Sequence, residues 1–520
     1  MKKHCVDLEK TGQFSPFFLD YLSGKEALKP FYSHPPREEG FDAAIQQKKF
    51  SIQQRRVLSE VLERQYQGVS PEPAVIENLK ALNSEKTFTV TTGHQLNLFT
   101  GPLYVIYKLV SVINLAKALQ GRYPDYKIVP VYWMATEDHD VEEINHFRLD
   151  QQTYTWNTNQ RGAVGEFELD SSFATFLSGL PFVPKEFSDA YTQSKTLGEA
   201  VRKYMHALFG AEGLVVVDGN DPQLKASFSE VILADLLEHK AFHLAEQTGK
   251  KLEVLGYGTQ LFPREINLFY LEKGIRERIV RKGDHFEVLH TPLQFSESEL
   301  KRLVKEHPER FSPNVILRPL YQEMILPNLG YVGGPAEVIY WLQLFDLFKG
   351  FEVPFPVLLP RNFALVLPKV IQKKIEQLAW TREQVFQKLE PWKKEFLKNS
   401  ASVDFTLAKE KEELTTLYDR LSSQAQSLEG GLVNAMEAGK VRSLAILEQM
   451  GSKFRKAEER RLEVDLERAR TVLEYVSPGG SPQERVLNLM NFSLENSHFL
   501  EDLMSSFDPL DSSMMILDLE

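Results

Sequence analysis

The chain has 520 residues, which corresponds to roughly three structural units at about 150 residues per domain. Hydrophobic residues make up 42% of it and aromatic residues 11%, so a large core can form and intrinsic disorder is excluded as the main state. The net charge of −11 argues against general binding to nucleic acids or anionic membranes, because both require a basic surface. A single cysteine, Cys5, excludes intrachain disulfides and zinc sites built from several thiolates.

The first residues predict where the protein is found. Residues 1–9 include Asp7 and Glu9 and lack the apolar stretch of a signal peptide. No segment approaches the ~18 to 20 apolar residues that a membrane helix needs. We therefore expect a cytoplasmic protein with neither a membrane nor a nucleic acid as partner.

Strands and helices alternate along the first two thirds of the chain. Residues 1–85 predict helices, and helices are also expected at 102–119 and 197–209. Near-continuous apolar runs predict the strands, at 86–92, 127–133, 213–218, 329–334 and 355–360. Pro356 places the last of them at a sheet edge or at a strand start. This alternation is typical of a parallel sheet covered on both faces.

The connections between these elements predict inserted subdomains. The second insert shows alternating strand patterns and carries four arginines, Arg264, Arg276, Arg278 and Arg281. The predicted domains are an N-terminal helical segment (1–85), a Rossmann-type core in three parts (86–149, 213–254 and 316–375), two connecting inserts (150–212 and 255–315), a helical region (376–476) that includes an arm (404–476), and a C-terminal helical segment (477–520).

Residues 404–476 predict a coiled-coil arm, since they contain no proline and leucine recurs every seven residues from Leu407 to Leu428. Two adjacent glycines interrupt the pattern, so we expect an antiparallel helical hairpin with its tip within 429–440. The alternative is a set of helices packed on the main domain. Dense charge on both sides of a narrow apolar stripe favours a projecting arm, and covering the stripe favours a homodimer.

The first candidate site follows the strand at 86–92. Glycines allow close approach of the backbone, and the start of the next helix offers free N–H groups to an anion. A tight turn with one packed histidine is the alternative. The candidate catalytic residues here are His94 and Gln95, and the candidate substrate-binding residues are Thr92, Gly93, Thr100, Gly101 and Tyr104.

The second candidate site follows the strand at 127–133. Asp138, His139 and Asp140 are candidate catalytic residues, and Trp133 is a candidate substrate-binding residue. Acids and a histidine at a strand's carboxyl end can bind an amine or a divalent ion, or transfer protons. The alternative is helix capping by Asp138 or Asp140.

Two further segments offer the start of a helix to an anion. Gly333, Gly334 and Glu337 follow a predicted strand, although a plain helix start is the simpler interpretation. The loop at 477–482 precedes another short helix near the return of the arm. This loop could form a second nucleotide or phosphate site away from the main crevice, with Gly479, Gly480, Gln483 and Arg485 as candidate residues. A plain hinge between helices is the favoured interpretation.

The motifs resemble those of the cysteine-adding enzymes of bacillithiol biosynthesis, also called cysteine ligases or bacillithiol synthases. Residues 92–104 match a family pattern of the form T-G-[QH]-Q-x-x-L-[FL]-T-G-P-L-Y, and residues 133–140 match W-x-A-[ST]-E-D-H-D. Three further segments are similar to family segments, at 333–337, 359–362 and 483–486, so the resemblance spans nearly the whole chain. The segment at 359–362 adds Arg361 and Asn362 to the candidate substrate-binding residues.

The resemblance implies an α/β fold with a Rossmann-type parallel sheet related to class I aminoacyl-tRNA synthetases, with connecting inserts and a C-terminal antiparallel coiled coil that helps to form a homodimer. It also implies a ligase that forms a carbon–nitrogen bond between L-cysteine and glucosaminyl-malate, the last step of bacillithiol synthesis. Two rival hypotheses are a ligase of the same fold with another amine or carboxylate substrate, and a non-catalytic coiled-coil assembly protein.

The residues suggest roles in such a ligase. Gly93, His94 and Gln95 would stabilise charge on an activated carboxyl group. Asp138 or Asp140 would hold the cysteine ammonium, and His139 would accept a proton.

The two carboxylates of glucosaminyl-malate would then meet Gly333, Gly334 and Arg361.

The sequence departs from class I synthetases, because His94 is followed by Gln95 rather than completing a two-histidine signature, and no lysine-rich loop follows the last strand. The use of ATP is therefore left open. We expect no resident metal and no cysteine-ligated zinc.

Overall fold

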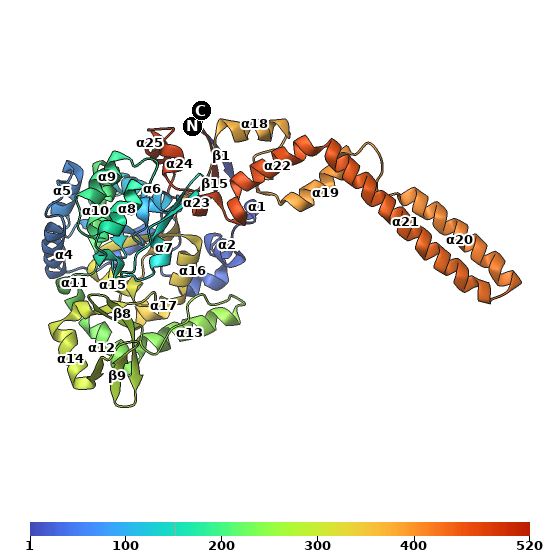
Figure 1. Ribbon diagram of the computed structural model, residues 1–520. Coiled ribbons are helices and arrows are strands. Elements are labelled where there is room, and N and C mark those ends of the chain that lie inside the picture. The colour runs from blue at the N-terminus through green and yellow to red at the C-terminus, as the bar shows by residue number, and fades with distance from the viewer. Residues whose placement is uncertain (151, 520) are drawn as a thin grey trace.

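In the computed structural model, which describes residues 1–150 and 152–519, the core is a five-stranded sheet in the order β13-β12-β2-β3-β6 (Figure 1). All neighbouring strands in it are parallel. The strands are β2 (Thr87–His94), β3 (Lys127–Met134), β6 (Val215–Asp218), β12 (Asn328–Gly333) and β13 (Val357–Pro360). The predicted Rossmann-type sheet is confirmed, and the strand that follows Pro356 lies at its edge.

Helices cover both faces of this sheet because its strands are apolar on both sides. In β3, Val129 and Trp133 belong to one core cluster, together with residues of α4 (Ile52–Gln65) and α16 (Pro335–Gln343). Ile128 and Tyr132 belong to the other cluster, together with α6 (Tyr104–Arg122) and α10 (Leu197–Phe209). Successive side chains of a strand point to opposite faces, so one strand contributes to both cores.

The parallel arrangement brings the carboxyl ends of the strands to one edge. Gly93 pairs with Trp133, Met134 pairs with Asp218, and Gly333 pairs with Pro360. Loops that follow these strands therefore open on a common crevice, where open α/β sheets bind ligands.

The two inserts pack on the core, because their buried residues belong to its two hydrophobic clusters. The first contains β4 (His146–Leu149), β5 (Gln152–Thr155), α8 (Ser171–Ser178) and α9 (Lys185–Thr192). The second is an antiparallel sheet in the order β10-β9-β8-β7-β11, which confirms its alternating pattern. Its strands are β7 (Leu268–Glu272), β8 (Ile275–Lys282), β9 (His285–Val288), β10 (Gln294–Ser296) and β11 (Phe311–Pro313).

The two ends of the chain form a sheet that the sequence did not predict. β1 (Lys2–Val6) pairs with β15 (Met514–Asp518), which pairs in turn with β14 (Phe363–Leu367). Figure 1 shows the termini side by side. The segments at both ends were expected to be helical, but their outermost residues form strands. The reason is that β15 is buried between β1 and β14, which are distant from it or from each other in the sequence.

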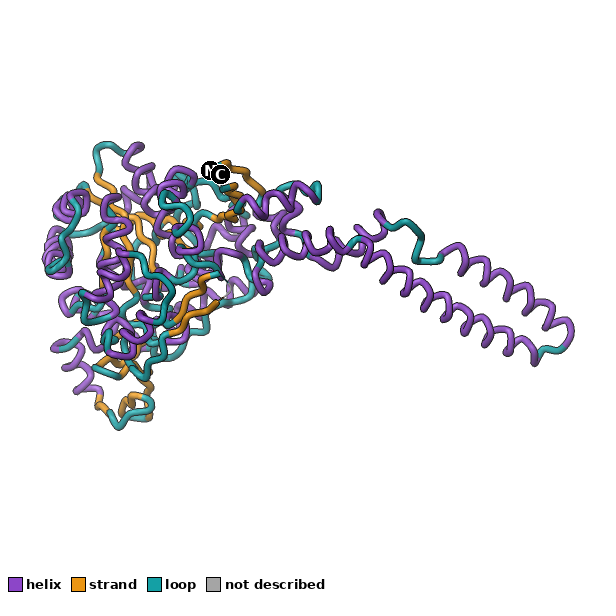
Figure 2. Tube along the Cα trace, turned by 45° about the horizontal axis from the view of Figure 1, so that its top comes forward, coloured by secondary structure: helices purple, strands orange, loops and turns teal. Residues whose placement is uncertain are grey.

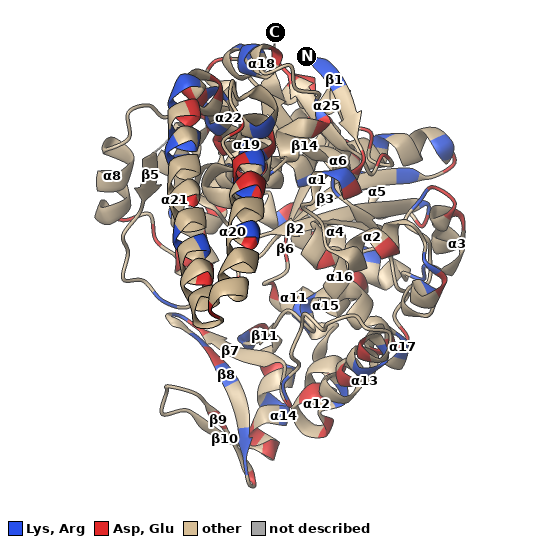
Figure 3. Cartoon of the chain, turned by 90° about the vertical axis from the view of Figure 1, so that its right-hand side faces the viewer, with Lys and Arg blue, Asp and Glu red and all other residues tan. Residues whose placement is uncertain are grey.

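The arm is a hairpin of α20 (Ala408–Leu428) and α21 (Gly431–Arg461), which projects from the body (Figure 2). Both helices carry acidic and basic residues along their length (Figure 3). The tip at 429–430 lies within the predicted range. Gly439 lies inside α21, where a Cβ would lie 2.9 Å from the Tyr418 ring across the hairpin, so a glycine allows the two helices to pack closely. The next helix, α22 (Glu463–Val476), packs on α18 (Lys369–Gln377) of the body, so the predicted arm of 404–476 projects only in part.

Across residues 1–150 and 152–519, no helix combines the length and the apolar character required to cross a bilayer.

Candidate active site

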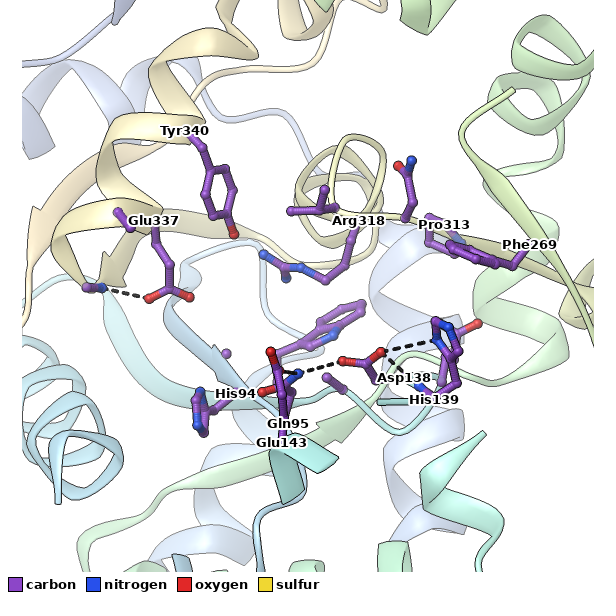
Figure 4. Close-up of a pocket in the computed structure, with 18 of the residues that line it drawn as sticks. His94, Gln95, Asp138, His139, Glu143, Phe269, Pro313, Arg318, Glu337 and Tyr340 are labelled. Atoms are coloured by element: carbon purple, nitrogen blue, oxygen red, sulfur yellow. Dashed lines mark hydrogen bonds and ion pairs between the residues drawn. The ribbon is translucent and has the colours of Figure 1, made fainter. Parts of the chain in front are cut away.

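A cavity of about 780 Å³ lies at the carboxyl edge of the parallel sheet, between the sheet and the second insert (Figure 4). Every predicted site contributes residues to its lining, but the loop glycines Gly479 and Gly480 do not. The predicted residues that line it are Gly93, His94, Gln95, Tyr104, Trp133, Asp138, His139, Gly334, Glu337, Arg361 and Arg485.

Other predicted residues lie in the walls rather than at the cavity. The Thr92 hydroxyl donates to the Val332 carbonyl at 2.8 Å. Thr100 and Gly101 are buried in the turn after β2, Gly333 is buried at the end of β12, and none of the three lines the cavity. Asn362 is also buried, and its amide donates to the Asp508 carbonyl at 2.5 Å. These residues hold the loops in place and do not face a ligand.

The position of Asp140 does not fit the catalytic role predicted for it. It is exposed at the start of α7 (Val141–Ile144), outside the cavity, and its side chain makes no capping hydrogen bond. The short turn after β3 directs Asp138 inward, and Asp140, two residues later, falls on the outside of the molecule.

Asp138 is the centre of an ordered polar cluster. Its Oδ2 accepts a hydrogen bond from Gln95 Nε2 at 2.8 Å, and the same amide donates to Glu143. Its Oδ1 accepts from the His139 backbone N–H at 2.8 Å and lies 3.6 Å from the Arg276 guanidinium. Burial alone would raise the pKa of Asp138, but the hydrogen bonds from His139 and Gln95 and the charge of Arg276 lower it well below its usual range. Asp138 is therefore ionised at neutral pH, and its carboxylate can accept a hydrogen bond from a cation.

Arg276 fixes the tautomer of His139. Its Nη1 lies 2.5 Å from His139 Nδ1, and its Nε donates to the Ser312 hydroxyl at 3.2 Å. The guanidinium also stacks on Phe269, 4.2 Å from the ring centroid. An arginine stays protonated, so Nδ1 accepts this hydrogen bond and the ring proton of a neutral His139 is on Nε2. The predicted role of His139 as proton acceptor thus requires Nδ1 to leave Arg276.

Lys108, Glu337 and His94 form a second cluster, which the sequence analysis identified only in part. Lys108 Nζ donates to Glu337 Oε2 at 2.5 Å and to the Gly93 carbonyl at 3.1 Å. Glu337 also accepts the Gly334 N–H at 2.6 Å, so that N–H, expected to meet a substrate carboxylate, is already paired. Lys108 is the single charged residue within the first 13 residues of the apolar helix α6, and that isolation was the available signal.

His94 is kept neutral by its surroundings. Burial and the charge of Lys108 lower the pKa of His94 to about 3. The ring contacts Tyr104 edge to face, with 5.3 Å between centroids. Its buried Nε2 has no hydrogen-bond partner among the residues that the structure describes. A neutral imidazole with one free nitrogen can orient a ligand, but it does not take up protons near neutral pH.

The lowered pKa of His94 predicts a loss of stability in mild acid. The unfolded chain binds a proton near pH 6.5 and the folded chain only near 3, so stability falls as the pH drops below about 6.5. The expected contribution at pH 5.5 is about 1.4 kcal/mol. Urea unfolding at pH 7.5 and 5.5 should show a smaller loss for His94→Gln than for the parent. His243→Gln, at an exposed position, should behave like the parent; an identical loss in His94→Gln would contradict the assignment.

Six arginines line the cavity. Arg276 is engaged with Asp138, and Arg361 is buried in a bidentate pair with Glu484, with one N–O distance of 2.8 Å. Within residues 1–150 and 152–519, the other four have no carboxylate within 4.0 Å; they are Arg264, Arg278, Arg318 and Arg485. Arg361 is therefore not free for a substrate, and the unpaired arginines complement negative charge.

Arg318 is the most deeply placed of these unpaired arginines. It begins α15 (Arg318–Ile325), donates to Gln322 Oε1 at 3.0 Å and lies over the Tyr331 ring. Figure 4 shows its guanidinium pointing into the space between Glu337 and the Gln95–Asp138 pair. The arginines of the second insert were noted in the sequence, but nothing in the sequence singled out Arg318.

Arg485 lies at the main cavity, 5.9 Å from the Tyr104 ring centroid, rather than at a separate site. Gln483 is buried and bonds to the Val366 N–H and carbonyl, at 2.9 and 3.0 Å. Gly479 and Gly480 adopt positive φ in an exposed turn before α23 (Gln483–Val486). The segment thus adds Arg485 to the main cavity, and its glycines stay apart from it.

An α/β fold with a charged cavity at the sheet's carboxyl edge, extended by a helical arm, defines a Rossmann-like enzyme with a coiled coil. Residues 1–362 match the family model described as "Bacillithiol biosynthesis BshC, N-terminal Rossmann-like domain", and residues 364–519 match that of the "C-terminal coiled-coil domain". The chain belongs to the bacillithiol biosynthesis BshC family, which confirms the resemblance.

Curated relatives match the chain along almost its whole length. A protein of Cytophaga hutchinsonii named "Putative cysteine ligase BshC" is 40% identical over 504 residues, which cover 97% of this chain and 96% of the relative. A protein of the same name from Christiangramia forsetii is 38% identical over 533 residues, covering 99% of each chain. One from Geobacillus sp. is 29% identical over 528 residues, covering 94% and 95%.

Proposed function

We propose that this chain is a ligase that joins the carboxyl group of L-cysteine to the amine of glucosaminyl-malate, the last step of bacillithiol synthesis. The observation that carries this proposal is the division of charge in one cavity. An ionised Asp138, joined to Glu143 through Gln95, and four arginines without carboxylate partners among the described residues line the same cavity. Such a site complements one substrate with an ammonium group and another with carboxylates.

The acidic residues suit the cysteine ammonium. Gln95 bridges Asp138 and Glu143 and holds both carboxylates toward the cavity. Asp138 keeps its charge at neutral pH because its hydrogen bonds favour the ionised form. A cation bound here would leave the carboxyl group of the amino acid directed along the cavity toward His94.

The unpaired arginines suit the two carboxylates of the malate group. Arg318 and Arg264 present guanidinium groups from different elements, and planar guanidinium groups can bind a carboxylate through two hydrogen bonds. This assignment replaces the predicted carboxylate contacts of Gly334 and Arg361, since Glu337 and Glu484 already occupy those two donors.

Amide formation from a free carboxylate requires activation, and ATP is the proposed activating co-substrate. The unpaired arginines fit a polyphosphate as well as carboxylates. In that reaction the cysteine carboxylate would attack the α-phosphate and release diphosphate, and the amine would then attack the acyl adenylate, releasing AMP and one proton. The neutral His94 and Arg485 would orient the anionic groups.

The test is an assay of the purified chain with L-cysteine and glucosaminyl-malate, with and without ATP, with mass-spectrometric detection of the product. Product formation that depends on ATP supports the full proposal, and product without ATP excludes ATP as the activating co-substrate. Product with another amino acid but not with cysteine favours the rival ligase. Absence of any amide product favours a non-catalytic assembly protein.

The arm supports a homodimer. A groove between α20 and α21 is lined by Leu414, Leu417, Ile446 and Leu447, and Ile446 is 52% exposed. Apolar side chains at this spacing on two helices are stable when a second surface covers them. We infer that a second copy of the chain covers the groove.

Ile446→Asp is expected to convert the dimer to a monomer, because it places a charge in the covered groove. Light scattering coupled to size-exclusion chromatography measures the mass. Val441→Asp is the matched control, since Val441 is equally apolar and exposed on the same helix but does not line the groove. A parent protein that runs as a monomer would contradict the proposal.

A further inference from the structure

Asp235 is a buried carboxyl group outside the cavity that no step of the reaction uses. It lies on α12 (Ser229–Glu238) and its exposed fraction is 0%. Both of its oxygens accept hydrogen bonds from one residue, Asn267: from the backbone N–H at 2.6 Å and from the side-chain amide at 3.1 Å. Burial raises the pKa of Asp235 to about 7, although the bonds from Asn267 oppose this. Burying a carboxylate costs free energy. A buried carboxylate that bonds one residue only therefore indicates that this residue has a role worth that cost.

Asn267 joins two segments that line the cavity. Its Oδ1 accepts hydrogen bonds from the Arg264 N–H at 3.1 Å and from the Asn314 side chain at 3.2 Å. Its Nδ2 also donates to the Arg264 carbonyl at 2.8 Å, and its own carbonyl accepts from the Asn314 N–H at 3.0 Å. Asn267, which is fully buried, thus ties the backbone at Arg264 to Asn314 through its side chain and its own carbonyl.

Asn314 passes this constraint on to Arg318. Its side-chain Oδ1 accepts the Ile316 N–H at 2.9 Å, and its carbonyl accepts the Arg318 N–H at 2.8 Å. These bonds form the turn that starts α15. The positions of two unpaired arginines, Arg264 and Arg318, therefore depend on the same Asp235–Asn267 pair.

We propose that Asp235 and Asn267 are positioning residues that set Arg264 and Arg318 for binding of the anionic co-substrate. The identity of that co-substrate rests on the proposed function. The pair touches no substrate and acts through the two arginines, because its hydrogen bonds fix the segments that carry them. A change in the pair alters where these two guanidinium groups lie.

The expected result for Asp235→Asn is a tenfold or greater rise in KM for glucosaminyl-malate, with kcat and the KM for cysteine changed less than twofold. The Asn267 amide would then face an amide donor instead of a carboxylate oxygen. Asp518→Asn is the matched control, since it also removes a buried carboxylate, in β15 and away from the cavity. A rise in both KM values alike, or the same rise in Asp518→Asn, would overturn the proposal.

A swapped pair keeps the test decisive if the single variant folds poorly. Asp235→Asn combined with Asn267→Asp preserves the described hydrogen bonds of the pair except the donation to the Arg264 carbonyl. It should restore the KM for glucosaminyl-malate to within about threefold of the parent, and a KM as high as that of the single variant would overturn the proposal.

The two proposals can fail separately. If the parent makes no amide product, calorimetry with inorganic diphosphate as the anionic probe tests the unpaired arginines without turnover. Weaker binding in Asp235→Asn but not in Asp518→Asn supports the positioning role, and equal binding in all three proteins overturns it.

Discussion

Replacing Asp138 by asparagine is expected to lower kcat/KM for amide formation by about ten- to hundredfold without unfolding the protein. A hydrogen bond to a charged group contributes about 1.5 to 3 kcal/mol, which corresponds to this range of rates. Asparagine has the same shape but no charge, so the ammonium of the bound amino acid loses its partner. The KM for cysteine should therefore rise along with any fall in kcat. Steady-state kinetics at varied cysteine, with circular dichroism as the check on folding, measures both.

Asp140→Asn is the matched control for this experiment. Asp140 is two residues away, exposed and outside the cavity, so its substitution should change kcat/KM by less than about twofold. An unchanged activity in Asp138→Asn would remove Asp138 from the site. An equal loss in both variants would show that the net charge of the loop matters rather than one carboxylate.

The sequence could place His94, Asp138 and Glu337 at one crevice because a single rule governs them. Each lies at or just after the carboxyl end of a buried parallel strand, and such ends meet at the same edge. The rule gives the position along the chain but not the direction of each side chain. Asp138 and Asp140 are indistinguishable in this respect, and only the path of the turn after β3 separates them.

The partners of charged residues could not be predicted, because they depend on contacts between distant segments. Arg361 pairs with Glu484, 123 positions later in the chain. That pair removes Arg361 from the free arginines, whereas Arg318 remains unpaired within the part of the chain that the structure describes. In the same way, the pairing of β1 with β15 depends on the folding of the whole body, so local patterns at the two ends did not reveal it.

The heptad pattern of the arm predicted its tip, since the regular spacing and the glycines are local signals. Where the arm meets the body was not predicted. α22 continues the same kind of pattern, but its buried residues Leu466, Ala469 and Val472 pack within the body. A helical repeat indicates that one face is covered and does not indicate by what.

Arg318→Ala is expected to raise the KM for glucosaminyl-malate by about ten- to hundredfold, with a smaller effect on kcat. The guanidinium has no carboxylate within 4.0 Å among residues 1–150 and 152–519, so its removal leaves no buried acid unpaired, and the loss falls on the ligand. A charged hydrogen bond of about 1.5 to 3 kcal/mol again sets the magnitude. Kinetics at varied glucosaminyl-malate and saturating cysteine measures the effect.

Two further variants decide whether substrate binding depends on the planar pair of N–H donors of Arg318 or only on its positive charge. Arg318→Lys keeps the charge but loses the planar pair of donors, so a bidentate contact predicts that it recovers only part of the affinity. Arg281→Ala is the matched control, because Arg281 is exposed on β8 of the second insert, lies over the Phe286 ring and does not line the cavity. Its removal lowers the positive charge of the protein by the same amount. Equal KM values for Arg318→Ala and Arg281→Ala would mean that substrate binding depends on the overall positive charge of the protein. The carboxylate of the substrate would then have no specific partner at Arg318.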